Sequence, residues 1–410
     1  MTEATATHAL APSTSHVALE ARHPQTAPAQ RRSLAPDLAR GALLLFIALA
    51  NVWTYLYGHS STTSLGERPA DASDLDRFVN GMTALLIDGR TRPMFAILYG
   101  FGIATMAARL AARGRDERGV RSVLARRSVG LIVLGLAHAA LLFGYDILAP
   151  YGVTGLLALV LVHRSRTALL RWFWGSLALM TAVFIPVIYG LVDLGDDGVE
   201  APTTDYLASA VERITNSALE SAMSGVLMFF VPHVVLGILL ARAGWLTDPA
   251  RHRGRLGRTA ALAGLVSLAT NLPYASAVVE LWHPQGALAS TALLAHELSG
   301  ITAGLAYVCL FGWLAAVWSE RRQVAVVGII VATGERSLTC YLLQSVMFAP
   351  MLSAWGLGLG GSLSTAQAAA LALAVWAVTV LVAVTLQRAG RTGPFEVVLR
   401  RWTYGVRRRA

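Results

Sequence analysis

The chain has 410 residues, of which 55% are hydrophobic and only 14% are charged. Soluble domains carry about 25% charged residues, so the composition excludes an ordinary soluble enzyme. Apolar runs close to the roughly 20 residues that a membrane-crossing helix needs recur along the chain. Because lipid offers the backbone no hydrogen-bond partner, such runs must be helical. We therefore predict an all-α fold, a polytopic transmembrane helical bundle.

The net charge is +10, and all 34 basic residues are arginines. These arginines lie in loops between the apolar runs, where membrane topology accounts for them, so we expect membrane lipids and not nucleic acid as partners. Cys309 and Cys340 lie inside apolar runs and form no CxxC or metal-ligand pattern. We expect two buried thiols, no metal and no bound cofactor.

In chain order, residues 1–33 are rich in Ala, Thr, Ser and Pro and lack the apolar core of a signal peptide. They predict a disordered cytoplasmic tail. Residues 34–388 form the predicted transmembrane domain, and residues 389–410 a basic cytoplasmic tail with an amphipathic segment. About ten spans are predicted, at residues 41–58, 93–112, 128–145, 148–162, 172–191, 222–241, 259–279, 293–318, the stretch after 334, and 368–387.

Arginine-rich loops alternate with acidic or short ones, which places both termini in the cytoplasm under the positive-inside rule. We expect a multi-pass protein of the bacterial cytoplasmic (inner) membrane; the sequence indicates no oligomeric state. A polar loop is expected between the first two spans, and a tight external re-entry between the third and the fourth. Gly334 with the pair Glu335–Arg336 interrupts the stretch 324–355, which predicts a half helix up to residue 333 followed by the ninth span.

Ionisable side chains within the apolar runs are the main functional candidates, because their insertion into lipid is costly. His138 lies in the third span, and Asp146 and Tyr151 follow at the re-entry. A histidine is suited to act as a general base, and Asp146 would orient it if the helix bends to bring them together. Alternatively, His138 bonds a neighbouring helix and Asp146 caps the fourth span.

The first span carries Arg40 near its start and Asn51 eleven residues later, about 16 Å apart along one helix face. Arg40 would bind a cofactor phosphate or extend to the lipid headgroups. Asn51 needs a hydrogen-bond partner, which helix packing alone can provide. Arg126 and Arg127, from the basic loop before the third span, are further phosphate-binding candidates.

The remaining polar groups are predicted to line a shared cavity or, alternatively, to serve packing and interface roles. His233 follows Pro232 in the sixth span, and "AHELSG" places His296 and Glu297 at the start of the eighth, where capping and interface roles are expected. That pair is not an HExxH motif, and no metal is assigned. The expected cavity-lining set is Tyr151, Arg92, Arg336, Tyr341, Gln344 and His233.

Four stretches resemble the YeiB-like bacterial membrane proteins, a family catalogued as a domain of unknown function. They are "DLARGALLLFIALANV", "RTRPMFAILYGFG", "RRSVGLIVLGLAHAALLFGYDILAPYGVTGLL" and "GERSLTCYLLQS…RTGPFEVVLRRWTY". Through this group the chain resembles the transmembrane acyltransferase superfamily, related to heparan-α-glucosaminide N-acetyltransferase.

The resemblance implies a helical bundle that takes an acyl group from acyl-CoA, as a co-substrate, and delivers it to a glycan or lipid-linked acceptor of the envelope. It also implies a buried histidine near an asparagine of the first span. Asn51 matches that asparagine, and His59 lies downstream with a shorter spacing than in the lysosomal enzyme. His138, with Asp146, is the first choice of base because it lies in the YeiB-like stretch itself. The alternatives are a small-molecule transporter and a non-catalytic scaffold or sensor.

Overall fold

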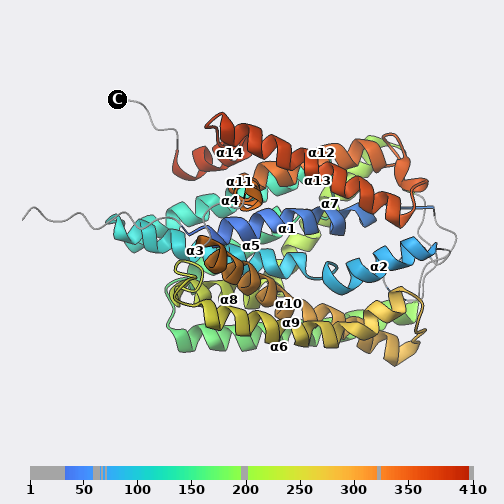
Figure 1. Cartoon of the computed structure of the whole chain (residues 1–410), viewed down its shortest axis with the longest axis horizontal. Coiled ribbons are helices and arrows are strands. Elements are labelled where there is room, and N and C mark those ends of the chain that lie inside the picture. The colour runs from blue at the N-terminus through green and yellow to red at the C-terminus, as the bar shows by residue number, and fades with distance from the viewer. Residues whose placement is uncertain are drawn as a thin grey trace, which may run out of the picture. The chain divides into compact units, whose positions relative to one another are not determined.

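The computed structural model of the chain describes residues 33–58, 65, 68–69, 72–194, 202–320 and 325–405. The predicted N-terminal tail, apart from Ser33, lies outside these residues. Within them the regular secondary structure is helical, as the composition predicts, and the all-α bundle is confirmed (Figure 1). The helices are α1 (Ala35–Val52), α2 (Asp74–Leu86), α3 (Thr91–Ala112), α4 (Glu117–Leu141), α5 (Leu148–Leu161), α6 (Arg166–Leu194), α7 (Tyr206–Val226), α8 (Val231–Arg242), α9 (Arg253–Val278), α10 (Gly286–Glu320), α11 (Ala325–Glu335), α12 (Ser337–Leu352), α13 (Thr365–Arg388) and α14 (Pro394–Tyr404), with short 3-10 turns at Trp53–Tyr55 and Leu359–Gly361.

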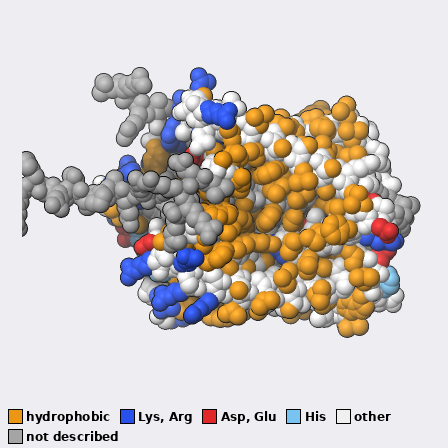
Figure 2. All heavy atoms as spheres, viewed as in Figure 1, with side chains coloured by type: hydrophobic (Ala, Val, Ile, Leu, Met, Phe, Trp, Pro, Cys, Tyr) orange, Lys and Arg blue, Asp and Glu red, His pale blue; other side chains and the backbone are white. Residues whose placement is uncertain are grey.

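Among the described residues, seven helical segments are long and apolar enough to cross a membrane, or up to nine if each of two bent helix pairs forms one span. The short apolar helix α5 is additional to these. The number of ten spans and the cytoplasmic location of both termini stay predictions. In Figure 2, most basic side chains of the visible face gather at one end, and hydrophobic side chains cover the middle. We call the former the arginine-rich end.

Helix α1 packs against α3, α10, α11, α12 and α13 (Figure 1). Close approach is made possible by glycines: a side chain at Gly41 would overlap the backbone of α11, and one at Gly334 the backbone of α1. Close packing occurs at Gly100 as well, because a Cβ there would overlap the backbone of α8 at Val234. Small residues thus determine how closely these membrane helices approach, as is common where lipid provides no hydrophobic driving force.

Two expectations about the chain path are wrong. The polar loop expected between the first two spans contains helix α2, whose start is fixed by a capping box in which Ser73 and Asp76 each bond the other's backbone N–H. The sixth span, expected as one helix over 222–241 with a kink at Pro232, is instead broken before that residue, between α7 and α8, which meet at 63°. Met228 at the break has φ 56°, and Pro232 occupies the first turn of α8, where its missing N–H costs no hydrogen bond.

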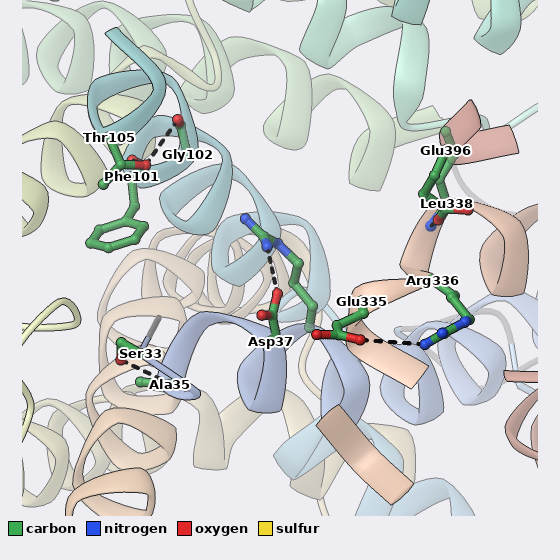
Figure 3. A network of polar contacts seen from close by, with 11 residues as sticks. Ser33, Ala35, Asp37, Phe101, Gly102, Thr105, Glu335, Arg336, Leu338 and Glu396 are labelled. Carbon is green, nitrogen blue, oxygen red and sulfur yellow. Dashed lines mark hydrogen bonds and ion pairs between the residues drawn. The ribbon is translucent and has the colours of Figure 1, made fainter. Parts of the chain in front are cut away.

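The expected interruption at Gly334–Arg336 is confirmed as an 81° bend between α11 and α12. Arg336 lies at the bend, where its guanidinium bonds the carbonyls of Ala332 and Arg391 and contacts Glu335 at 3.4 Å (Figure 3). Glu396, from the amphipathic helix α14, accepts hydrogen bonds from the free N–H groups of Leu338 and Thr339. Glu396 of the C-terminal segment therefore stabilises the start of α12, and Arg336 stabilises the end of α11.

Candidate functional site

A polar cavity of about 670 Å³ lies between α1, α3, α6, α7, α8, α9 and α10, with Arg68, Asp88 and Gly89 also in its wall. It extends from Ile47 to Thr54 along the first helix, a rise of about 10 Å, and Thr54 and Tyr145 are solvent-exposed near its mouth. Its lining contains cationic, anionic and imidazole groups, a combination typical of binding and active sites. The polar lining residues are Asn51, Thr54, Arg68, Asp88, Thr91, Arg92, Tyr145, Glu220, Ser224, His233, Tyr274, His296 and Glu297.

Two arginines of the cavity are paired with carboxylates. Arg68 Nη2 lies 2.7 Å from Asp88 Oδ2, and the Arg68 guanidinium also stacks over the ring of Trp53, 4.1 Å from its centre. Arg92 Nη1 lies 2.9 Å from Glu220 Oε1 on α7. The Arg92–Glu220 contact joins α3 to α7, which are distant in sequence. Both contacts hold charged groups at the wall where a polar substrate would bind.

His296 is held in a defined orientation at the cavity wall. Its Nδ1 lies 2.6 Å from Oδ1 of Asn271 on α9, and its ring stacks on Tyr274 with 3.8 Å between centroids. Asn271 Nδ2 donates to the carbonyl of Ala84, so its oxygen faces the histidine. Nδ1 must therefore carry the proton, and Nε2 carries the lone pair.

The position of Nε2 depends on the turn before α3. Gly89 has φ +69°, and a Cβ at that position would lie only 2.7 Å from His296 Nε2. Glycine is thus required both by the backbone conformation and by the close approach of the imidazole. His296 and Gly89 both line the cavity, which places a basic nitrogen next to the space a substrate would occupy.

The predicted pair His138–Asp146 forms, but inside the packed protein. His138 Nδ1 lies 2.8 Å from Asp146 Oδ1, with side chains only 2% and 0% exposed. Tyr341 donates to the same carboxylate oxygen at 3.1 Å. Asp146 Oδ2 accepts from the N–H of Ala149 and so caps α5, which combines the two alternatives that the sequence left open. Neither His138 nor Asp146 lines the polar cavity, although Tyr145 and Ile147 do.

The other predicted site residues divide into two groups. Asn51, Arg92 and His233 line the polar cavity, whereas Tyr151, Tyr341, Gln344 and Arg336 do not. Their polar groups are instead used in packing: the Tyr151 hydroxyl donates to the Arg92 carbonyl at 2.6 Å, and Gln344 Nε2 donates to the Leu44 carbonyl at 3.0 Å. His59 lies outside the described residues.

The three arginines expected to hold phosphates lie on α1 and α4. Arg40 is bonded to Asp37, one helical turn before it, at 3.1 Å (Figure 3). Arg126 is exposed and Arg127 is half-buried on α4. In the described part of the chain, no group of three or more His, Cys, Asp or Glu side chains could hold a metal ion.

Several cavity residues were not predicted from the sequence. His296 and Glu297 were assigned capping and interface roles, and Asn271, Arg68 and Asp88 were not chosen as site residues. A signal for Asn271 exists, since an amide within an apolar helix needs a partner from another helix. The partner itself lies 25 residues away on α10, a distance at which spacing gives no guidance.

Comparison with known proteins shows what the chain is similar to. Residues 240–406 match the family described as "Protein of unknown function (DUF418)". The uncharacterised protein YeiB of Escherichia coli (strain K12) is 25% identical over 395 residues, which cover 91% of this chain and 96% of YeiB. The chain is therefore similar to YeiB along most of its length, and its C-terminal part matches the DUF418 family.

The likeness extends to a second bacterial group. The uncharacterised protein YxaH of Bacillus subtilis (strain 168) is 24% identical over 398 residues, 90% of this chain and 93% of YxaH. The expected resemblance to YeiB-like proteins is confirmed along nearly the whole chain. The DUF418 match contains α9, α10 and the bend at Arg336, so it includes both Asn271 and His296.

Proposed function

We propose that this YeiB-like protein is a membrane-embedded acyltransferase that moves an acyl group from acyl-CoA to a glycan or lipid-linked acceptor of the envelope. The observation that carries the proposal is His296 at the wall of the polar cavity, with Nδ1 held by Asn271 and Nε2 free to accept a proton. A neutral histidine oriented in this way is a general base at physiological pH.

In the proposed step, Nε2 of His296 takes the proton of an acceptor hydroxyl while the hydroxyl oxygen attacks the thioester carbon of acyl-CoA. A C–O bond forms, the C–S bond breaks, and coenzyme A leaves as a thiolate that receives the proton from the imidazolium. Arg92 and Arg68 provide positive charge at the cavity wall, which favours the negative charge that develops on the thioester oxygen. Arg40, Arg126 and Arg127 are the proposed contacts for the coenzyme A phosphates.

The base in this proposal is His296 and not His138, the first choice from sequence. A base must reach the proton it abstracts, and His138 is enclosed by Asp146, Tyr341 and Phe143. The pair His138–Asp146 then has a structural role, joining the end of α4 to the start of α5.

The test uses purified protein in phospholipid vesicles that contain lipids and lipid-linked glycans extracted from bacterial envelopes. Acetyl-CoA with a radiolabelled acetyl group is added, and label in the extracted lipid and glycan fractions is counted. The His296→Gln variant is expected to lose about 10²–10⁴-fold in rate. His283→Gln, an exposed histidine outside the cavity, is the matched control and should keep the wild-type rate. If acetyl-CoA and longer acyl-CoA donors all leave the wild-type fractions unlabelled, the acyltransferase assignment is wrong.

One observation favours a transporter as the second candidate. The helix pair α7–α8 is broken by 63°, and Phe229 and Phe230 at the break line the polar cavity. Broken helices beside a polar cavity are typical of transport sites. A transporter would load vesicles with a solute in response to an imposed proton gradient and would leave acetyl-CoA intact, so the same vesicles distinguish the two functions.

A further inference from the structure

An apolar groove runs between α9 and α10, separate from the polar cavity. It has a volume of about 450 Å³ and is lined mainly by small or apolar side chains, among them Gly257, Gly264, Ala303 and Ala306. Both helices are candidate membrane spans, and only 33% of the most apolar stretch of α9 is buried inside the protein. The groove therefore adjoins the hydrocarbon of the bilayer, and its glycines and alanines leave room for a hydrocarbon chain beside the larger Tyr307 and Trp313.

Unpartnered polar atoms occur within the groove lining. Arg90 and Ser267 both line the groove and are only 1% and 3% exposed. Yet Arg90 Nη2 and Ser267 Oγ have no hydrogen-bond partner among the described residues. Buried polar groups are nearly always bonded, so a ligand oxygen is a direct explanation for two unpartnered donors in one groove. The permanent positive charge of arginine favours an anionic oxygen.

Hydrogen bonds link Arg90 in the groove to residues that orient the polar cavity's histidine. Arg90 Nη1 and Asn271 Nδ2 both bond the carbonyl of Ala84, at the end of α2. Asn271 also orients His296, and Gly89, next to Arg90, lines the cavity beside the imidazole. A head group bound at Arg90 would thus lie one residue along the chain from the cavity wall.

We propose that the apolar groove binds one hydrocarbon chain of a phosphate-bearing lipid, whose head group reaches Arg90 and Ser267. This inference rests on the proposed function and names the acceptor class: a lipid-linked acceptor that enters sideways from the bilayer. Its chain lies along α9 and α10, and the group to be acylated extends past Gly89 into the polar cavity. Membrane-bound substrates reach a site by this route without leaving the bilayer.

The test measures binding without acyl transfer. A long-chain alkyl phosphate with a photoreactive diazirine in its chain is mixed into phosphatidylcholine vesicles with the protein, with no acyl-CoA present. After illumination, the labelled residues are mapped by peptide mass spectrometry. Label is expected on residues 257–268 and 303–313. A matched alkyl alcohol probe should give at least about tenfold less label, because it lacks the anionic head group. Equal labelling by the two probes would overturn the role of Arg90.

A variant that fills the groove provides the second arm. A Cβ at position 264 would lie 3.9 Å from the Cβ of Ala306, so the Gly264→Leu side chain would fill the groove. We expect this variant to lower groove labelling about tenfold or more. Gly190→Leu is the matched control, because a Cβ at Gly190 meets nothing within 4 Å. Undiminished labelling in Gly264→Leu would overturn the groove as the binding site. If the groove is labelled but the protein transfers no acyl group, the proposed function is wrong and the groove proposal stands. If the protein transfers acyl groups but the groove is not labelled, the groove proposal is wrong and the proposed function stands.

Discussion

Two histidines, His138 and His296, have the same local arrangement and different surroundings. In each, Nδ1 donates to an oxygen of another segment, Asp146 for the first and Asn271 for the second. The Nε2 of His138 is buried and has no hydrogen-bond partner within the described part of the chain, whereas His296 lies at the wall of the polar cavity. Orientation of an imidazole is therefore common to a packing role and a catalytic one, and access to a substrate distinguishes them.

Replacing each of the two histidines in turn gives the largest expected difference between them. His296→Gln should lower acyl transfer by about 10²–10⁴-fold, whereas His138→Gln should keep the wild-type rate per folded molecule. The measurement is the initial rate of label transfer, normalised to the folded protein recovered after size-exclusion chromatography. A His138→Gln protein that elutes as wild type and transfers no label would return the catalytic role to His138.

The next largest effect concerns stability. Asp146→Ala removes a fully buried carboxylate that accepts from His138, Tyr341 and Ala149, and leaves three donors without a partner. Removing one partner of a buried pair costs about 3–5 kcal/mol in the free energy of unfolding. Denaturant unfolding in detergent measures the loss. Asp74→Ala, at a fully exposed carboxylate, is the control, and equal stability of the two variants would show that the buried pair has no structural role.

The His138–Asp146 contact could be predicted from the sequence, because both residues flank one short re-entry and the chain cannot carry them far apart. The interruption at Glu335–Arg336 was predictable for a similar reason, since a charged pair stands inside one apolar run. The His296–Asn271 contact joins two different helices, and its register depends on how closely α9 and α10 pack. No pattern in this one sequence indicates the register of α9 against α10.

Helix α2 and the break before α8 show two other limits. The acidic residues near Asp74 indicated a loop by composition, although Ser73 and Asp76 have the spacing of a capping box. The break at residues 227–230 lies in a continuous apolar run, where hydrophobic pattern predicts one span. Its cause is tertiary, since α8 packs against α3 through Gly100 and Gly237, where side chains would overlap the facing backbone.

A third prediction tests whether the orientation of His296 by Asn271 is needed for activity. Asn271→Leu removes the acceptor of His296 Nδ1 and should lower the transfer rate about 10²-fold through misorientation. Asn271→Asp keeps an acceptor at the same place and loses only the bond to Ala84, so it should recover much of that rate. Rates of the two variants are compared at saturating acetyl-CoA. Equal loss in both would show that Asn271 serves packing and does not position the base.

The smallest effect is expected from a single hydroxyl in the buried cluster. Tyr341→Phe removes the hydrogen bond to Asp146 Oδ1 while His138 and the Ala149 N–H still hold the carboxylate. A single neutral hydrogen bond contributes about 0.5–1.5 kcal/mol, so the free energy of unfolding should fall by that amount, well below the loss in Asp146→Ala. Tyr307→Phe, which removes a 2.6 Å bond to the carbonyl of Leu86 at the apolar groove, is the matched control outside the buried cluster. A loss in Tyr341→Phe as large as in Asp146→Ala would mean that the hydroxyl, and not the imidazole, is the main partner of the buried carboxylate.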